Sequence, residues 1–190
     1  MRFRALILSL AAYIIALGLS SSSFAQTKAD TINKALVKTH STLSKRYNRV
    51  SHIDAQALSK MDEDSYIIFD VREKDEFEVS HIENSIWVDP SIDASSFNAQ
   101  YSDQIGDKTL VLYCSVGVRS SRLAQKLEKT RPDTETSPIY NLENGVFGWH
   151  NESRPLVSET ASTDYVHPYN RLWGSMVNRK NLRRYEPEEK

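Results

Sequence analysis

The middle of the chain contains several short apolar runs, each of which is bounded by charged residues, glycine or proline. Runs of this kind, rich in β-branched and aromatic residues, are typical of buried strands. The second run stops at Asp89-Pro90, where proline cannot donate to a ladder. The predicted strands are Tyr66–Phe69, which ends at Asp70, Ser85–Val88, Thr109–Tyr113 and Ser137–Leu142.

Between and before these runs, apolar residues recur at helical spacing. Residues 28–48 are predicted to form an amphipathic helix with Ile32, Leu36, Leu43 and Tyr47 on one face. A longer helix is expected over residues 119–130, with Pro132 just past its end. Shorter helices are expected over residues 53–58, with Ser51 as a polar cap, over residues 73–78, and at Val146–Trp149.

This alternation of strands and helices predicts the fold class. Strands separated by helical crossovers pair in parallel, and helices then cover both faces of the sheet. We therefore expect an α/β fold, a three-layer α/β/α sandwich with a mainly parallel central sheet. In such folds the chemistry lies at the carboxyl ends of the strands.

The first residues are typical of a secretory signal peptide. Arg2 and Arg4 precede an apolar stretch from Ala5 to Leu19, and small residues ending in Ala25 follow. An uncleaved anchor is the alternative, but the stretch is about 15 residues against the roughly 20 that a spanning helix needs. We expect cleavage after residue 25, a periplasmic or secreted protein, and no membrane span after cleavage. Losing both arginines changes the formal net charge from −1 to −3.

The remaining chain divides into one domain with two flanking arms. Residues 26–50 form a basic helical arm, residues 51–157 the domain, and residues 158–190 an aromatic and basic arm that begins with a polar linker. Either arm offers a surface for a protein partner or for self-association. The basic run Arg179–Arg184 is interpreted as a solvated helix end, so we expect no nucleic-acid partner.

The single cysteine, Cys114, directly follows the strand Thr109–Tyr113 and precedes a helix. Backbone N–H groups and the helix dipole at such a junction favour a thiolate. An exported cysteine without an intramolecular partner is reactive, bridged to another molecule, or simply buried. Its position favours a reactive nucleophile. The five histidines show no metal-ligand spacing, so neither a metal nor another cofactor is expected.

Three segments, in order, resemble the rhodanese family, the sulfurtransferase homology domain. They are Asp70–Glu73 with Glu76-Phe77 and His81–Ile86, then Leu112–Ser121, then Leu142–Trp149 with Pro155. Two departures stand out: Ser80 replaces the usual glycine before His81, and Asn144-Gly145 replaces a pair of glycines. Asparagine tolerates the left-handed conformation, so we expect the second turn to survive.

The resemblance implies a sulfurtransferase. Cys114 would attack the outer sulfur of a donor such as thiosulfate and pass it from a persulfide to a thiol or cyanide acceptor. Asp70 either braces the cysteine loop or is a surface charge, and Arg72 pairs with Glu73, Glu76 or another nearby acid. Arg119 either contacts substrate or is a strut. The expected loop and substrate-binding residues, whose N–H groups point inward, are Ser115, Val116, Gly117, Val118, Arg119 and Ser120.

Two alternatives remain open. Cysteine phosphatases and arsenate reductases also use a loop between a cysteine and an arginine. Their loop resembles this one but is one residue longer. Only Ser115 to Val118 separate Cys114 from Arg119, which suits one sulfur atom better than a phosphate. The other alternative is a non-catalytic binding or sulfur-carrier module.

Overall fold

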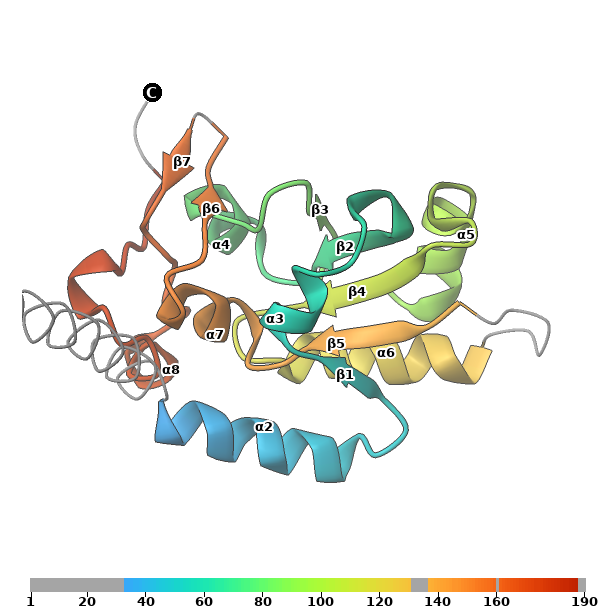
Figure 1. Cartoon of the computed structure of the whole chain (residues 1–190), viewed down its shortest axis with the longest axis horizontal. Coiled ribbons are helices and arrows are strands. Elements are labelled where there is room, and N and C mark those ends of the chain that lie inside the picture. The colour runs from blue at the N-terminus through green and yellow to red at the C-terminus, as the bar shows by residue number, and fades with distance from the viewer. Residues whose placement is uncertain (1–32, 131–136, 160, 188–190) are drawn as a thin grey trace, which may run out of the picture. The chain divides into compact units, whose positions relative to one another are not determined.

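A parallel sheet forms the centre of the protein. The computed structural model describes residues 33–130, 137–159 and 161–187; the signal peptide predicted for residues 1–25 lies outside them. Within these ranges a five-stranded sheet runs in the order β1-β5-β4-β2-β3, with every pairing parallel (Figure 1). The strands are β1 Ser51–Ile53, β2 Tyr66–Asp70, β3 Ile86–Trp87, β4 Thr109–Tyr113 and β5 Ile139–Leu142.

The central strands explain why the sequence is almost continuously apolar there. Successive side chains of a strand point to opposite faces, and both faces of this sheet are covered. Phe69 and Leu112 enter the core on one face, whereas Ile68, Val111 and Tyr113 enter the core on the other.

Helices cover both faces of the sheet. One layer contains α5 (Ala94–Ile105) and α6 (Val118–Thr130), and the opposite layer contains α3 (Ala55–Leu58) and α7 (Gly145–Asn151) (Figure 1). The 3-10 turn η1 (Glu63–Ser65) precedes β2, and the short helix α4 (Lys74–Val79) follows β2. The predicted three-layer α/β fold is confirmed, and the sheet is parallel throughout the described residues.

The prediction for residues 51–58 was wrong in part. Ser51 does not cap a helix: Ser51–Ile53 is strand β1, which pairs with β5. The helix begins at Ala55, and its cap is Asp54, whose side chain accepts a hydrogen bond of 2.6 Å from the Ala57 N–H. Helix α5 is not among the predicted helices, although Asp93 caps it and Phe97, Tyr101 and Ile105 form a buried stripe.

Helix α2 (Lys34–Arg46) lies within the range predicted for the N-terminal arm. Leu36, Leu43 and Tyr47 are buried, and they enter the hydrophobic cores on both sides of the sheet. Its lysines are exposed. The hydrophobic effect therefore holds α2 on the domain.

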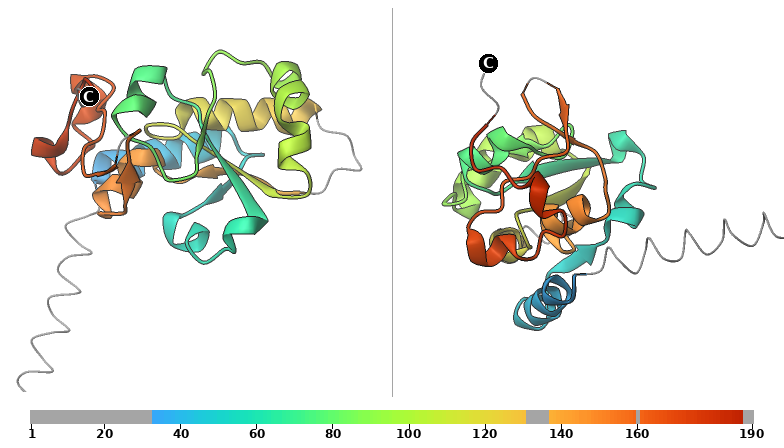
Figure 2. Two further views of the ribbon diagram at one scale, coloured as in Figure 1. Left: turned by 90° about the horizontal axis from the view of Figure 1, so that it is seen from above. Right: turned by 90° about the vertical axis from the view of Figure 1, so that its left-hand side faces the viewer.

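The C-terminal segment, residues 164–187, also packs on the domain, at the carboxyl end of the sheet (Figure 2). Val166 and Val177 are fully buried, and the Asn151 amide donates to Met176 O at 2.9 Å. Arg179 and Arg183 donate to backbone carbonyls of this chain, so the basic run is not a solvated helix end. The hairpin of β6 (Leu156–Val157) and β7 (Ser162–Thr163) precedes this segment, which contains the helix α8 (Arg171–Gly174) and the 3-10 turn η2 (Lys180–Leu182).

Membrane-spanning helices were sought among the same residues. Within the described ranges, no helix combines the length and the apolar character needed to cross a bilayer.

Candidate active site

Cys114 lies at the carboxyl end of the central strand β4, directly before the loop that leads into α6. This is the edge of a parallel sheet where strand ends and helix N-termini converge. The cysteine is only 1% exposed, and Ser115 and Val116 beside it are also buried. Its surroundings therefore decide whether the thiol can ionise.

Those surroundings are polar at the sulfur. The Gly117 N–H donates to Sγ at 3.2 Å. Burial raises the pKa of the Cys114 thiol, whereas the positive charge of Arg119 and hydrogen bonds from Ser120 and Val116 lower it. The lowering is the larger effect, so the pKa lies below its usual value. A lowered pKa increases the fraction of thiolate, the form that reacts as a nucleophile.

A close approach of α7 fixes the backbone of the loop. The N–H groups of Val146 and Phe147 donate to Cys114 O and Ser115 O, at 2.9 and 3.1 Å. A Cβ atom at Gly145 would lie 2.2 Å from Cys114 O, so only glycine fits there. Asn144 adopts a left-handed φ of +61°, as expected for the residue that replaces the family's first glycine.

The other departure from the family pattern needs no special conformation. Ser80 is fully buried with a φ of −171°, which is extended backbone open to any residue. Glycine is therefore not required before His81. The His81 ring stacks on Phe77, and its Nδ1 lies 3.0 Å from Phe77 O, which makes the histidine structural.

Glu76 of α4 is the residue that the sequence analysis missed. Its carboxylate lies 2.7 Å from Arg119 Nη1 and accepts a hydrogen bond of 2.6 Å from Ser115 Oγ. Arg119 Nη2 donates in turn to Ser115 Oγ at 2.9 Å. Burial raises the pKa of Glu76, but Arg119, Arg72 and Ser115 lower it to below its usual value, so the carboxylate is ionised at neutral pH.

This triangle of Glu76, Ser115 and Arg119 determines what Arg119 can do. Nη1 lies against the Glu76 carboxylate and Nη2 donates to Ser115 Oγ, so Arg119 acts as a strut, and each of these nitrogens carries a second N–H. Its charge still acts on Cys114 through space. Glu76 was discoverable in principle, because it stands at the third position of α4 in a capping box with Glu73.

Asp70 and Arg72 form a second ion pair, away from the loop. Arg72 Nε donates to Asp70 at 2.9 Å, and its Nη2 also donates to Ser80 O at 2.6 Å. Both side chains are fully buried. Asp70 is therefore not a surface charge, and it braces the connection from β2 to α4 rather than the cysteine loop. Arg72 pairs with Asp70, rather than with Glu73 or Glu76.

The remaining loop residues divide between polar and apolar roles. Ser120 is buried, and its hydroxyl donates to Asn141 Oδ1 at 2.6 Å, which ties the start of α6 to β5. Gly117 has a φ of +98°, the left-handed region that favours glycine. Val116 and Val118 belong to the hydrophobic core, so their side chains are structural.

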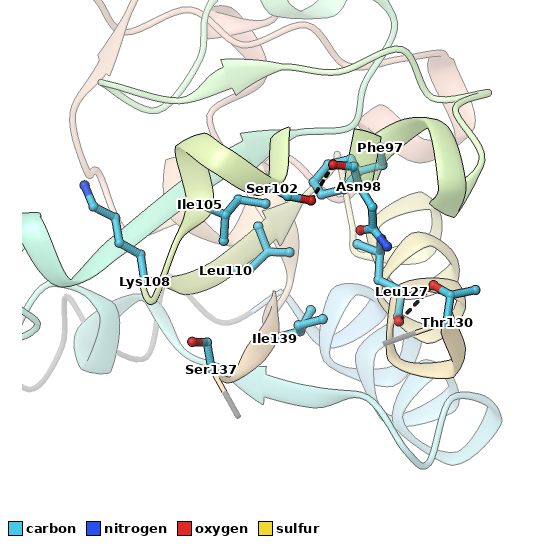
Figure 3. A pocket seen from close by; sticks show the side chains of 10 residues that line it. All are labelled: Phe97, Asn98, Ser102, Ile105, Lys108, Leu110, Leu127, Thr130, Ser137 and Ile139. Carbon is cyan, nitrogen blue, oxygen red and sulfur yellow. Dashed lines mark hydrogen bonds between the residues drawn. The ribbon is translucent and has the colours of Figure 1, made fainter. Parts of the chain in front are cut away.

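The cavity shown in Figure 3 is a separate feature. It has a volume of about 270 Å³ and lies between α5 and α6, at the amino ends of β4 and β5, lined by residues such as Ile105, Leu110 and Ile139. Cys114 is at the other end of β4. Among the described residues no cluster of three or more acidic, histidine or cysteine side chains could hold a metal ion.

Comparison with known proteins agrees with this geometry. The uncharacterized protein YqhL of Bacillus subtilis is 37% identical over 82 residues, which are 43% of this chain and 59% of that protein. The chain therefore spans less than two thirds of that relative. The thiosulfate sulfurtransferase GlpE of Coxiella burnetii is 28% identical over 104 residues, 54% of this chain and 87% of that one.

Solved structures share the fold. The thiosulfate sulfurtransferase from Pseudomonas aeruginosa superposes with a TM-score of 0.53 at 18% identity, covering 65% of this chain and 23% of that one. The family model described as the rhodanese-like domain matches residues 54–152. That range includes Cys114 with its whole loop, both ion pairs and the glycine of α7 that the loop requires, and we conclude that the chain belongs to the rhodanese-like domain family.

Proposed function

We propose that this protein is a sulfurtransferase that moves sulfane sulfur from a donor such as thiosulfate to a thiol or cyanide through a persulfide on Cys114. The observation that carries the proposal is the lowered pKa of a cysteine whose sulfur accepts a hydrogen bond from the loop backbone. The similarity to GlpE of Coxiella burnetii supports the same reaction.

In the first step the Cys114 thiolate attacks the outer sulfur of thiosulfate. A bond forms between Sγ and that sulfur, and the S–S bond of the donor breaks. The bonding pair leaves with sulfite, so the cysteine gains one sulfur atom as a persulfide. Inward N–H groups such as that of Gly117 stabilise the negative charge on the sulfur, and no general base is needed.

In the second step an acceptor thiolate or cyanide attacks the terminal sulfur of the persulfide. The new bond joins the acceptor to that sulfur, and the S–S bond to Cys114 breaks. The electron pair returns to Sγ, which regenerates the thiolate. The positive charge of Arg119 stabilises this leaving group, because it favours the ionised form of Cys114.

The charges near the site indicate a weak grip on thiosulfate itself. The charge of Arg119 is balanced by Glu76 at 2.7 Å, and Glu73 lies 3.5 Å away on its exposed side. A doubly charged donor therefore meets little net positive charge. We expect a high KM for thiosulfate, and a lower one for a less charged persulfide donor.

The phosphatase alternative fits less well. A phosphate bound in such a loop needs the positive charge of the arginine, whereas the Glu76 carboxylate, 2.7 Å from Arg119 Nη1, already balances that charge. The loop is also one residue shorter than a phosphatase loop. The carrier-module alternative shares the persulfide and differs only in lacking turnover.

Mass spectrometry after incubation with thiosulfate tests the proposal. We expect the wild type to gain one sulfur atom and to release it to cyanide, whereas Cys114→Ser gains none. The control is Ser121→Ala, a buried serine of α6 outside the cysteine loop. Hydrolysis of an aryl phosphate without any sulfur adduct would instead support a phosphatase, and an adduct that no acceptor removes would support the carrier module.

Export is a separate proposal, supported by the signal-peptide pattern of residues 1–25. We propose a periplasmic or secreted protein. Expression of the full chain followed by amino-terminal sequencing of the exported fraction tests it, with Gln26 expected as the first residue. A product that keeps residues 1–25 in the cytoplasm would overturn this proposal without touching the sulfurtransferase.

A further inference from the structure

The side chain of Tyr169, in the C-terminal segment, contacts Arg119 of the cysteine loop. The Arg119 guanidinium carbon lies 5.1 Å from the centre of the Tyr169 ring, a cation–π contact. Residues beyond 152 lie outside the match to the family model. Tyr169 therefore lies outside the matched domain, and the segment that carries it lies at the carboxyl end of the sheet in both Figure 1 and Figure 2.

Arg119 is thereby enclosed from several directions. Glu76 and Ser115 hold its nitrogens, and Tyr169 contacts the guanidinium. The Tyr169 side chain is nevertheless exposed to solvent, since the residue is 45% accessible. The ring therefore forms part of the outer surface beside the arginine of the buried loop.

The backbone holds Tyr169 firmly in this position. Its φ of +61° is unusual for a bulky residue, so the surrounding contacts must maintain it. Its N–H donates to His167 Nδ1 at 3.1 Å, and Val166 is fully buried. Val166 also exchanges backbone hydrogen bonds with Leu182 and Arg184. The ring is thus part of a fixed wall rather than of a loose tail.

We propose that Tyr169 is a specificity-determining residue, which admits small thiols to the Cys114 persulfide and excludes thiols carried on folded proteins. The proposal rests on the proposed sulfurtransferase function. Its basis is the combination of a cysteine that is 1% exposed with a fixed aromatic ring on the arginine of the same loop. A small thiol can pass between such groups, whereas a cysteine on a protein surface brings its neighbouring residues against the ring.

The reaction that is selected is the second half of the cycle. An acceptor thiolate attacks the outer sulfur of the Cys114 persulfide, forming one S–S bond while the S–S bond to Cys114 breaks. The electron pair stays on the Cys114 sulfur, and no outside oxidant or reductant is needed. Selection at this step changes which acceptor is used without changing the chemistry.

The test compares two acceptors, free cysteine and a small folded protein with one exposed cysteine. For the wild type we expect kcat/KM to favour free cysteine. For Tyr169→Ala we expect the ratio between the two acceptors to shift toward the protein thiol by about tenfold, within the range that a single pocket contact provides. Tyr169→Phe keeps the ring and should keep the wild-type ratio. Leu172→Ala, a 76% exposed residue on the same segment, is the matched control.

A second measurement separates this proposal from the sulfurtransferase function. The rate of alkylation of Cys114 by iodoacetamide is compared with the rate for a maleimide joined to a long polyethylene glycol chain. We expect Tyr169→Ala to accelerate the bulky reagent more than the small one, whether or not a persulfide ever forms. Equal acceleration of both, together with a lower Tm, would show that Tyr169 only anchors the segment and would overturn the proposal.

Discussion

Two arginine–carboxylate pairs, Asp70–Arg72 and Glu76–Arg119, have different roles. In the first, Asp70 and Arg72 are both fully buried, and Arg72 also donates to a backbone carbonyl. In the second, Glu76 is buried, whereas the Arg119 side chain is 19% exposed and faces the cysteine loop. The chemistry of the two pairs is the same, so their surroundings make the difference.

The comparison teaches that burial alone does not mark a functional pair. The Asp70–Arg72 pair fixes the turn between β2 and α4, and we expect its loss to act on folding. The Glu76–Arg119 pair orients a positive charge toward Cys114, and its loss should act on the pKa of the thiol. The reactivity of Cys114 should therefore respond to substitutions in the second pair and not to those in the first.

Arg72→Met is expected to have the largest effect, a loss of folding stability. It leaves Asp70 charged and unpaired in the interior, so the free energy of unfolding should fall by about 3–5 kcal/mol. Urea denaturation followed by circular dichroism measures the loss. In the fraction that remains folded, the pH profile of Cys114 alkylation should match the wild type.

The double variant Asp70→Asn with Arg72→Met is the control for this pair. It removes both charges, and we expect part of the lost stability to return, because no ion is left buried without a partner. If the single and double variants were equally destabilised, packing of the long arginine side chain would outweigh its charge.

Arg119→Met is expected to have the next largest effect, on the ionisation of Cys114. Without its positive charge the pKa of Cys114 rises, so a smaller fraction of the thiol is ionised near pH 7 and alkylation there is slower. Iodoacetamide alkylation from pH 5 to 10 measures the shift. For the wild type we expect the midpoint below the usual value for cysteine, because the pKa is lowered. An unchanged midpoint in Arg119→Met would mean that the backbone N–H groups alone stabilise the thiolate.

The smallest effect is expected for Glu73→Gln. Its side chain is 55% exposed and lies 3.5 Å from Arg119, and exposed pairs of this kind contribute about 0.5 kcal/mol or less. We expect almost no change in the unfolding free energy, with a slight fall in the midpoint of Cys114 alkylation as Arg119 loses a screening charge. A loss comparable with that of Arg72→Met would contradict the distinction between buried and exposed partners.

The local elements could largely be predicted from the sequence. The strand Thr109–Tyr113 has the predicted bounds, and the helix predicted over residues 119–130 begins one residue earlier, at Val118. Strand β1 could not be recognised, since a three-residue strand with one buried side chain has no clear periodicity. Helix α5 could have been found from its Asp93 cap and the spacing of Phe97, Tyr101 and Ile105.

The candidate site was predictable only where its residues are adjacent in the chain. The loop from Cys114 to Ser120 follows from its position between a strand and a helix. Glu76 and Tyr169 lie far from it in sequence and reach it only through packing of α4 and the C-terminal segment. Whether Arg72 would pair with Asp70 or with an acid of α4 was likewise open, because several acids lie within a few residues of it.

The sequence by itself determined the alternation of elements and the place of the cysteine, because hydrophobic periodicity and turn residues act over a few neighbouring positions. The tertiary structure alone decided which carboxylate holds which arginine, how deeply Cys114 is buried, and which side chain stands beside its loop. Those properties depend on contacts between distant segments, whose electrostatic energies are set by distance and by exclusion of water.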